Sequence, residues 1–244
     1  MYHYVQDKDF LRRAQSASSR MLKKVEELLR KEYKINSQIF LVGSGARNMV
    51  TQNESESIDF DYNLNIISCP DWEKPRSIKE SVRKVMNRIM TNEGLGTVND
   101  STSCLTTKTI SFEDSPENKW SIDLCIVTKD SNGNWQRLIH KKTGFAQYDR
   151  YFWNTTPNSE DYSYKAAKIK ECPGWWDEVR NSYLRIKNHY LQNHDYNHPS
   201  FVCYIEAVNE IYNRIGCRNN GVTHFPSNNE LLDDILSSIQ KNNF

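Results

Sequence analysis

Three aspartates stand in strand-like stretches of the sequence where hydrophobic residues would be expected. Asp59 and Asp61 alternate with large hydrophobic residues in "SIDFDYNLNII" (57–67), and Asp123 has similar neighbours in "KWSIDLCIVTK" (119–129). Alternate side chains of a strand share a face, so Asp59 and Asp61 lie side by side on one surface. Neighbouring carboxylates repel each other unless a cation neutralises them or one is protonated. This pattern therefore indicates a cation site.

The chemistry of these three acids favours magnesium. Carboxylate oxygens are hard ligands, and Mg²⁺ binds proteins through few carboxylates together with substrate phosphates. Two such ions roughly 4 Å apart activate an attacking hydroxyl and stabilise a leaving pyrophosphate. We therefore expect Asp59, Asp61 and Asp123 to be catalytic metal ligands for Mg²⁺ or Mn²⁺ in an enzyme that transfers a phosphoryl group.

A glycine-serine turn supplies a possible partner for these acids. Gly43 and Ser44 follow the apolar strand "IFLV" and precede "ARNMVTQ" (46–52), whose composition fits a helix. Backbone amides at the start of such a helix bind phosphate well. The turn is not a Walker A loop, since no GK[ST] follows. Asp59 comes fifteen positions after Ser44, so the turn and the acids are expected to form one site.

The hydrophobic periodicity predicts which elements position these residues. A helical pattern covers 7–34 and another covers 76–96, and after about Thr156 only helical patterns occur, over 159–171, 175–194, 200–216 and 228–240. Strand-like runs cover 37–43, 57–67, 106–113 and 119–129. The order predicts an α+β fold with a mixed sheet flanked by helices, followed by a C-terminal helical bundle.

Composition narrows the classes of protein. The chain has 244 residues and a net charge of +1, so we find no strong evidence for binding nucleic acid or an anionic membrane. Between Arg137 and Lys170 there are seven Lys/Arg and three acids. This local excess of positive charge faces either a phosphate-bearing ligand or solvent. No apolar run has the length of a transmembrane helix or a signal peptide, so a cytoplasmic protein is expected.

Cysteines and histidines are expected to be structural. The six cysteines are widely spread without zinc spacing, which favours reduced thiols. The six histidines include "HYLQNHDYNH" (189–198), where His189 and His194 are five positions apart and do not share a helix face. We expect the histidines at the surface or as helix caps.

The Gly-Ser turn, "IDFDYNL" and "SIDLCIV" together resemble the hallmark of the DNA polymerase beta-like nucleotidyltransferase superfamily. The resemblance covers roughly residues 36–128. It implies that Gly43 and Ser44 contact the triphosphate of a nucleotide. It also implies that Asp59, Asp61 and Asp123 bind two Mg²⁺ ions.

The C-terminal part shows a second resemblance. "YLRIKNHYL" followed by "HPSFVCYIEAV" is similar to the helices of oligoadenylate-synthetase-like and bacterial cyclic-oligonucleotide-synthase enzymes. This resemblance implies that Lys187 and Ser200 hold the triphosphate and that Phe201 stacks on the base. A structural alternative remains open, in which Phe201 is a core residue, Ser200 caps a helix and Lys187 is solvated.

These observations lead to one leading function and two alternatives. Residues 1–156 are expected to be the catalytic module and residues 157–244 a helical module that closes the nucleotide cleft. The leading function is a nucleotidyltransferase that uses a nucleoside triphosphate and makes a short linear or cyclic oligonucleotide, as in bacterial antiviral defence. The first alternative transfers a nucleotide to a protein, an RNA end or a small molecule such as an antibiotic. The second is a nucleotide sensor without turnover.

Overall fold

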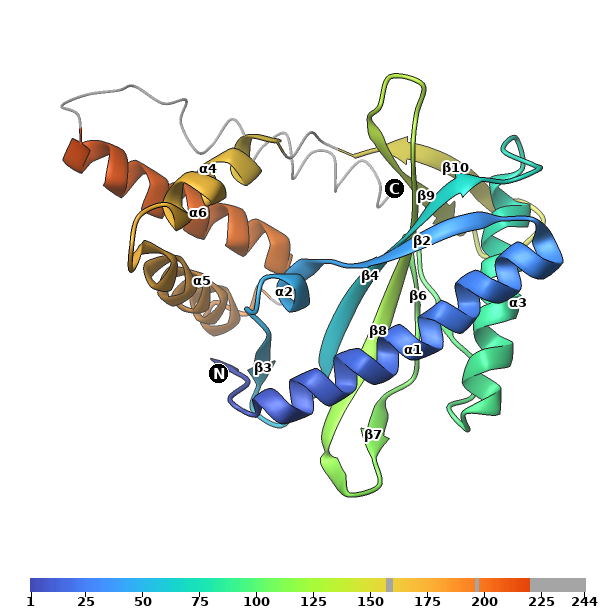
Figure 1. The fold of residues 1–244 in the computed structure, drawn as a ribbon, viewed down its shortest axis with the longest axis horizontal. Helices are drawn as coiled ribbons and strands as arrows, with labels where there is room; N and C mark the ends of the chain where they lie inside the picture. Colours follow the sequence, from blue (N-terminus) through green and yellow to red (C-terminus); the bar gives the residue numbers. More distant parts are fainter. Residues whose placement is uncertain (157–159, 196–197, 220–244) are drawn as a thin grey trace. The chain divides into compact units, whose positions relative to one another are not determined.

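The computed structural model divides into two compact units, which are described separately. The sheet unit comprises Tyr4–Thr156, and the helical unit comprises Met1–His3 together with the described part of 157–244. The structure describes residues 1–156, 160–195 and 198–219, so the helix expected over 228–240 lies outside them. Figure 1 shows the elements of each unit in sequence colours. Strand β1 (Tyr2–Tyr4) spans the boundary between the units.

A mixed sheet forms the centre of the sheet unit. Its main strands lie in the order β10-β9-β8-β4-β2. In chain order they are β2 (Asn36–Leu41), β4 (Ile58–Ser68), β8 (Ser115–Lys129), β9 (Trp135–Lys141) and β10 (Arg150–Thr155). The short strands β6 (Cys104–Thr106) and β7 (Ile110–Phe112) also pair with β8, and β5 (Asn99–Asp100) pairs with β6. Strands β4 and β8 are parallel, while the other pairs of this sheet are antiparallel.

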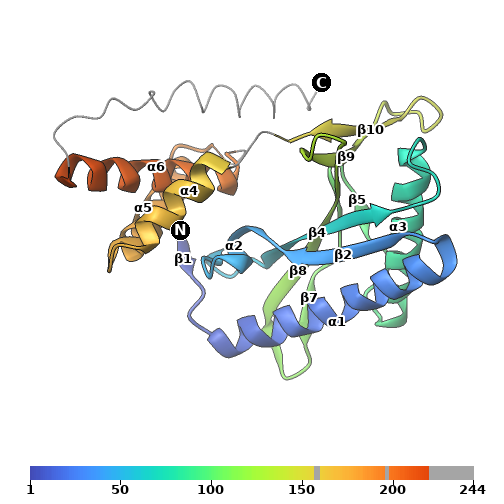
Figure 2. The same ribbon diagram turned by 45° about the horizontal axis from the view of Figure 1, so that its top comes forward.

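Two long helices cover one face of this sheet. Helices α1 (Lys8–Tyr33) and α3 (Pro75–Asn92) lie on the same side of the sheet in Figures 1 and 2. The side chain of Asp7 accepts a hydrogen bond from the Phe10 amide at 2.8 Å and so caps the start of α1. At its end, Lys34 adopts a left-handed conformation that terminates the helix. Both helices were predicted from the sequence, and the structure confirms them.

The strands that carry the acids have one apolar and one polar face. The even-numbered side chains in the central parts of β4 and β8 are buried in the core with α1 and α3; they are Ile58, Phe60, Tyr62, Leu64, Ile66, Trp120, Ile122, Leu124 and Ile126. Because side chains alternate along a strand, the odd-numbered residues point to the opposite face. Asp59, Asp61 and Asp123 therefore share the face away from the core helices.

Two local expectations from the sequence are wrong. The run 106–113 is not one strand, because it is broken between β6 and β7. At the break, the Thr107 hydroxyl accepts the Ile122 amide at 2.9 Å and takes the place of a backbone carbonyl in the ladder. The stretch 46–52 is not a helix either. Helix α2 (Gly43–Ala46) is a single turn, and strand β3 (Thr51–Asn53) follows after Asn48 at a positive φ of 56°.

The helical unit contains α4 (Glu160–Lys170), α5 (Trp175–Gln192) and α6 (Ser200–Asn219). Helix α6 packs against both α4 and α5, and its buried side chains include Val202, Ile205 and Val208. The amino-terminal segment is held to α5, since the amide and carbonyl of Tyr2 both bond to the Asn188 side chain. Strands followed by C-terminal helices give the α+β fold that the sequence predicted. Within the described residues, no helix is long and apolar enough to cross a membrane.

Candidate active site

The pairing of β4 with β8 brings the three aspartates to neighbouring positions. In this parallel pair Asp61 lies opposite Asp123, and Asp59 lies opposite Ser121. Asp59 is exposed, whereas Asp61 and Asp123 are half-buried. Asp123, which follows Asp61 by 62 positions and Asp59 by 64 positions in the sequence, thus lies beside both on one sheet face. The shared face was predicted for Asp59 and Asp61 from alternation, and the register adds Asp123.

Hydroxyl groups from the same sheet hold two of the carboxylates. Ser121 donates a hydrogen bond to Asp59, and Thr106 donates one to Oδ1 of Asp123. Thr106 is also the register partner of Asp123 on the β6 side of β8. Each hydroxyl fixes one carboxylate oxygen and leaves the other oxygen for a further ligand. The sequence analysis missed both hydroxyls, although alternation in 119–129 places Ser121 on the face of Asp123.

Burial and mutual repulsion change the acidity of the two half-buried acids. The pKa of Asp61 rises to about 6, mainly through desolvation and then through the negative charge of Asp59. The pKa of Asp123 rises to about 7, again mainly through desolvation, with Cys104 next in effect. Ionised carboxylates in this position are destabilised unless a cation lies beside them. The electrostatics of this face therefore favour a bound cation at neutral pH.

Gly43 lies directly against one of these acids. Its φ is +63°, and a Cβ atom at this position would lie 2.2 Å from Oδ2 of Asp61. The amide of Val42 donates to the Asp61 carbonyl at 2.8 Å, which fixes the turn against β4. The backbone of Ser44 closes the turn by accepting from Met49 at 2.9 Å. The Gly-Ser turn therefore lies against Asp61, and α2 is one turn rather than a longer helix.

The donor chemistry of the site fits a divalent cation. Asp59, Asp61 and Asp123 present hard oxygen donors on one face, and desolvation, followed by the charge of neighbouring groups, raises the pKa values of Asp61 and Asp123. Within the ranges 1–156, 160–195 and 198–219, however, the structure has no group of three or more His, Cys, Asp or Glu side chains arranged to hold a metal ion. The residues fit Mg²⁺ or Mn²⁺ by type and by face, and their coordination geometry is not formed.

The other three predicted site residues belong to the helical unit. Lys187 lies on α5 with its ammonium 3.8 Å from the centre of the Tyr2 ring. Ser200 is the first residue of α6 and is exposed. Phe201 is 43% exposed and contacts Tyr162 edge-on, with ring centres 5.9 Å apart. Phe201 is therefore not a core residue, and part of its ring is open to a ligand.

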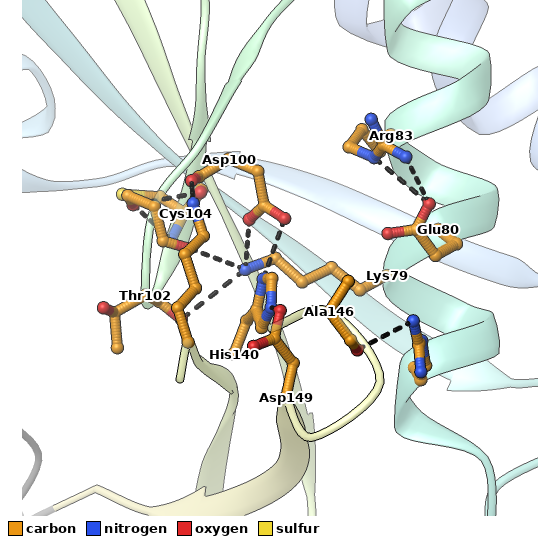
Figure 3. Close-up of polar contacts among 12 residues, drawn as sticks. Lys79, Glu80, Arg83, Asp100, Thr102, Cys104, His140, Ala146 and Asp149 are labelled. Atoms are coloured by element: carbon orange, nitrogen blue, oxygen red, sulfur yellow. Dashed lines mark hydrogen bonds and ion pairs between the residues drawn. The ribbon is translucent and has the colours of Figure 1, made fainter. Parts of the chain in front are cut away.

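A buried network near the acids was not predicted. Lys79 of α3 is 1% exposed and forms an ion pair with Asp100 at 2.7 Å. His140 of β9 lies between Asp100 and Asp149, at 2.8 and 2.9 Å, as Figure 3 shows. The expectation of a surface or capping histidine is wrong for His140, because its position beside Leu138 in alternation places it in the sheet unit's interior. Lys79 also had a sequence signal: it lies three positions before Val82 on the apolar face of α3.

The network anchors the hairpin that carries Thr106. Besides Asp100, the Lys79 ammonium contacts the carbonyl of Ser101 at 2.8 Å. The amide of His140 donates to the carbonyl of Thr102 at 2.7 Å. Both carbonyls belong to the turn between β5 and β6. The buried charges therefore hold the hairpin in place, and the hairpin holds Asp123 through Thr106.

Two cysteines lie near Asp123, and an arginine of β9 acts on Asp61 and on both thiols. Cys104 of β6 is the register partner of Cys125 of β8. The interaction between the two thiols lowers the pKa of Cys104 to about 5 and raises that of Cys125 well above its usual value. The positive charge of Arg137 opposes the rise in the pKa of Asp61 and of Cys125, and it adds to the fall in the pKa of Cys104. Arg137, which the sequence analysis counted only within a basic segment, thus acts electrostatically on the acid face.

The fold of the described chain can be compared with that of solved structures. It is similar to the fold of the bacterial CD-NTases DncV and CdnC. The resemblance predicted from the sequence is therefore confirmed at the level of the fold. No family model matches the sequence. No curated protein matches it either.

Three solved structures carry the comparison. CdnC from E. coli MS115-1, solved with ATP, matches 84% of this chain with a TM-score of 0.52 and 14% identity. DncV from Vibrio cholerae in a GTP-bound form matches 91% with a TM-score of 0.50 and 12% identity. The di-nucleotide cyclase DncV with GTP and 5MTHFGLU2 matches 93% with the same TM-score and identity. The chain spans 61%, 54% and 58% of those chains, respectively.

Proposed function

We propose that the chain is a Mg²⁺-dependent nucleotidyltransferase that uses a nucleoside triphosphate and releases pyrophosphate. The proposal depends chiefly on the β4–β8 register, which sets Asp61 opposite Asp123 with Gly43 against Asp61. In this proposal Asp59, Asp61 and Asp123 hold the cations. Bound there, Mg²⁺ or Mn²⁺ increases the acidity of an attacking hydroxyl and neutralises charge on a leaving pyrophosphate.

The residues around the acids have separate roles in this proposal. Gly43 and Ser44 contact the triphosphate, because the absence of a side chain at Gly43 lets the backbone approach the acid face closely. Thr106 and Ser121 orient the carboxylates through their hydroxyl groups. Arg137 adds positive charge on the same face and so favours an anionic substrate.

The helical unit contributes the remaining nucleotide contacts in this proposal. Lys187 and Ser200 contact the triphosphate, and Phe201 stacks on the base. The exposed ring of Phe201 supports this role, since a ring buried in the core would have no free face. Residues 157–244 then act as the module that closes the nucleotide cleft.

For the acceptor, we propose the hydroxyl of a second nucleotide, which gives a short linear or cyclic oligonucleotide signal of the antiviral-defence kind. The observation that favours this acceptor over a protein or an antibiotic is the fold shared with DncV, which is described as a di-nucleotide cyclase. CdnC was solved with ATP, and DncV with GTP, so both triphosphates are reasonable first substrates.

The test is product formation from labelled nucleotides. The protein is incubated with labelled ATP, GTP, CTP and UTP and with Mg²⁺ or Mn²⁺, and the products are resolved by chromatography. We expect pyrophosphate release without an added acceptor and a product that contains more than one nucleotide. Release only after a protein, an RNA or a small molecule is added would overturn the proposed acceptor. Nucleotide binding without release under any condition would overturn catalysis and support a sensor.

A matched pair of variants separates the site from general effects of charge. Asp61→Asn is expected to lower turnover by about a hundredfold or more, because it removes a metal ligand and not only an outer contact. Glu117→Gln makes the same chemical change at an exposed position of β8 and is expected to leave turnover unchanged. Equal turnover of Asp61→Asn and wild type would show that Asp61 holds no catalytic ion.

A further inference from the structure

Cys104 and Cys125 form a pair that faces across two antiparallel strands. They are direct register partners in the β6–β8 pair. Both thiols are free and half-buried, and neither is enclosed in the apolar core. Cys104 belongs to a strand of three residues beside a turn, and Cys125 belongs to the long central strand β8.

The hydrogen-bond pattern places this pair at a position that suits a disulfide. Thr107 donates its amide to the Ile122 carbonyl at 3.0 Å, which marks their rung as a hydrogen-bonded one. Hydrogen-bonded and non-hydrogen-bonded rungs alternate in an antiparallel pair. The Cys104–Cys125 pair lies three rungs from the Thr107–Ile122 pair, so it occupies a non-hydrogen-bonded rung. The Cα atoms of such a rung are about 4.5 Å apart, within the range of about 4.4–6.8 Å found for disulfides.

We propose that Cys104 and Cys125 are a redox modification site that forms a reversible disulfide when hydrogen peroxide is the oxidant. The Cys104 sulfur attacks one peroxide oxygen, the O–O bond breaks, and a sulfenic acid and one water form. The Cys125 sulfur then attacks the sulfenic sulfur, the S–O bond breaks, and a second water leaves with the Cys125 proton. Two thiols are oxidised to one disulfide while hydrogen peroxide is reduced to two waters.

The disulfide has a consequence for the acid face, and this consequence depends on the proposed function. Cys125 lies two residues after Asp123 and Cys104 two residues before Thr106, so all four share one sheet face. Opposite Cβ atoms of a sheet are about 4.5–5.5 Å apart, but those of a disulfide are about 3.8 Å apart. Oxidation therefore pulls β6 towards β8 beside Asp123 and displaces the Thr106 hydroxyl from its hydrogen bond with the Asp123 carboxylate.

The first test detects the bond itself and does not depend on catalysis. Trypsin places the two cysteines on separate peptides, 89–108 and 120–129, each with a single cysteine. After treatment with hydrogen peroxide and alkylation, we expect these two peptides to be linked, the intact mass to fall by two hydrogens, and dithiothreitol to reverse both changes. Two fully alkylated thiols after treatment, or a link to another cysteine, would overturn the proposal.

Single variants distinguish a specific pair from general thiol oxidation. Cys125→Ser is expected to stop at the Cys104 sulfenic acid, which dimedone traps. Cys172→Ser changes a half-buried thiol of the helical unit and is expected to form the 104–125 link as wild type does. Failure of the link in Cys172→Ser would contradict the assignment of the pair.

The second test measures the effect on metal binding by titration with Mn²⁺, followed by electron paramagnetic resonance. We expect oxidation to lower the affinity of wild type for Mn²⁺ by about tenfold, as loss of an outer contact does, and Cys125→Ser to show no such change. Linked peptides with unchanged Mn²⁺ affinity would overturn the coupling to Asp123. No detectable Mn²⁺ binding in either the reduced or the oxidised protein would instead contradict the proposed function.

Discussion

At the scale of single residues, the position of the Asp61 carboxylate depends on the absence of a side chain at Gly43. Gly43→Ala adds a Cβ atom 2.2 Å from Oδ2 of Asp61 and places it on a residue with φ of +63°. The positive φ alone costs about 1–2 kcal/mol for a residue with a side chain. We expect the variant to lose more than this in the free energy of unfolding, measured with urea, because Asp61 must also move.

Gly94→Ala is the matched control for this prediction. Gly94 has φ of +76°, and an added Cβ would meet nothing within 4 Å. The difference in unfolding free energy between the two variants isolates the contact with Asp61. Equal losses in both variants would show that Asp61 adapts without cost.

Stability of the metal-free protein should depend on pH through the same acids. The pKa values of Asp61 and Asp123 rise from 3.8 to about 6 and about 7 in the folded chain. Between pH 4 and these values the folded state binds more protons than the unfolded state, so this contribution to stability falls as pH rises. We expect Asp123→Asn to flatten the decline of Tm from pH 5 to pH 8, measured by calorimetry without metal. The exposed Glu117→Gln should keep the wild-type slope, and an unaltered slope in Asp123→Asn would refute the assignment.

At the scale of elements, the buried ion pair of Lys79 holds α3 to the β5–β6 hairpin. Lys79→Met leaves Asp100 buried beside His140 without its cation. Loss of one partner from a buried pair destabilises proteins by about 3–5 kcal/mol. We expect a loss of that size in the unfolding free energy, whereas Lys24→Met, which breaks the exposed pair with Glu93, should cost about 1 kcal/mol or less. Similar losses in the two variants would show that the network is not an anchor.

Regular elements could be predicted from the sequence because their signals are local and repeated. The period of apolar residues was sufficient for α1 and α3, and the alternation around Asp59 and Asp61 was sufficient for β4. The break between β6 and β7 could not be predicted, because it depends on the Thr107 hydroxyl, which replaces a backbone carbonyl as the acceptor of the Ile122 amide. Thr106 was missed as a partner of Asp123 because the register between two distant strands cannot be deduced from the sequence of either strand alone.

At the scale of the whole molecule, the candidate residues are divided between the two units. Gly43, Ser44 and the three acids belong to the sheet unit, and Lys187, Ser200 and Phe201 belong to the helical unit. If both units contact one nucleotide, as we propose, a change in the helical unit should weaken nucleotide binding and leave metal binding intact. We expect Lys187→Ala to raise the Kd for a triphosphate by about tenfold, equivalent to about 1.4 kcal/mol, in isothermal titration.

The control for Lys187 must separate its charge from its packing, because its ammonium lies over the ring of Tyr2. Tyr2→Leu removes the ring and keeps the lysine, while the backbone of Tyr2 can still bond to Asn188. We expect Tyr2→Leu to change the triphosphate Kd by less than about twofold, well below the tenfold step that 1.4 kcal/mol represents. Mn²⁺ affinity should stay at the wild-type value in both variants, since the acids are untouched. Equal losses of nucleotide affinity in Tyr2→Leu and Lys187→Ala would mean that the lysine serves to dock the amino terminus, and the helical unit would then lose its assigned cation.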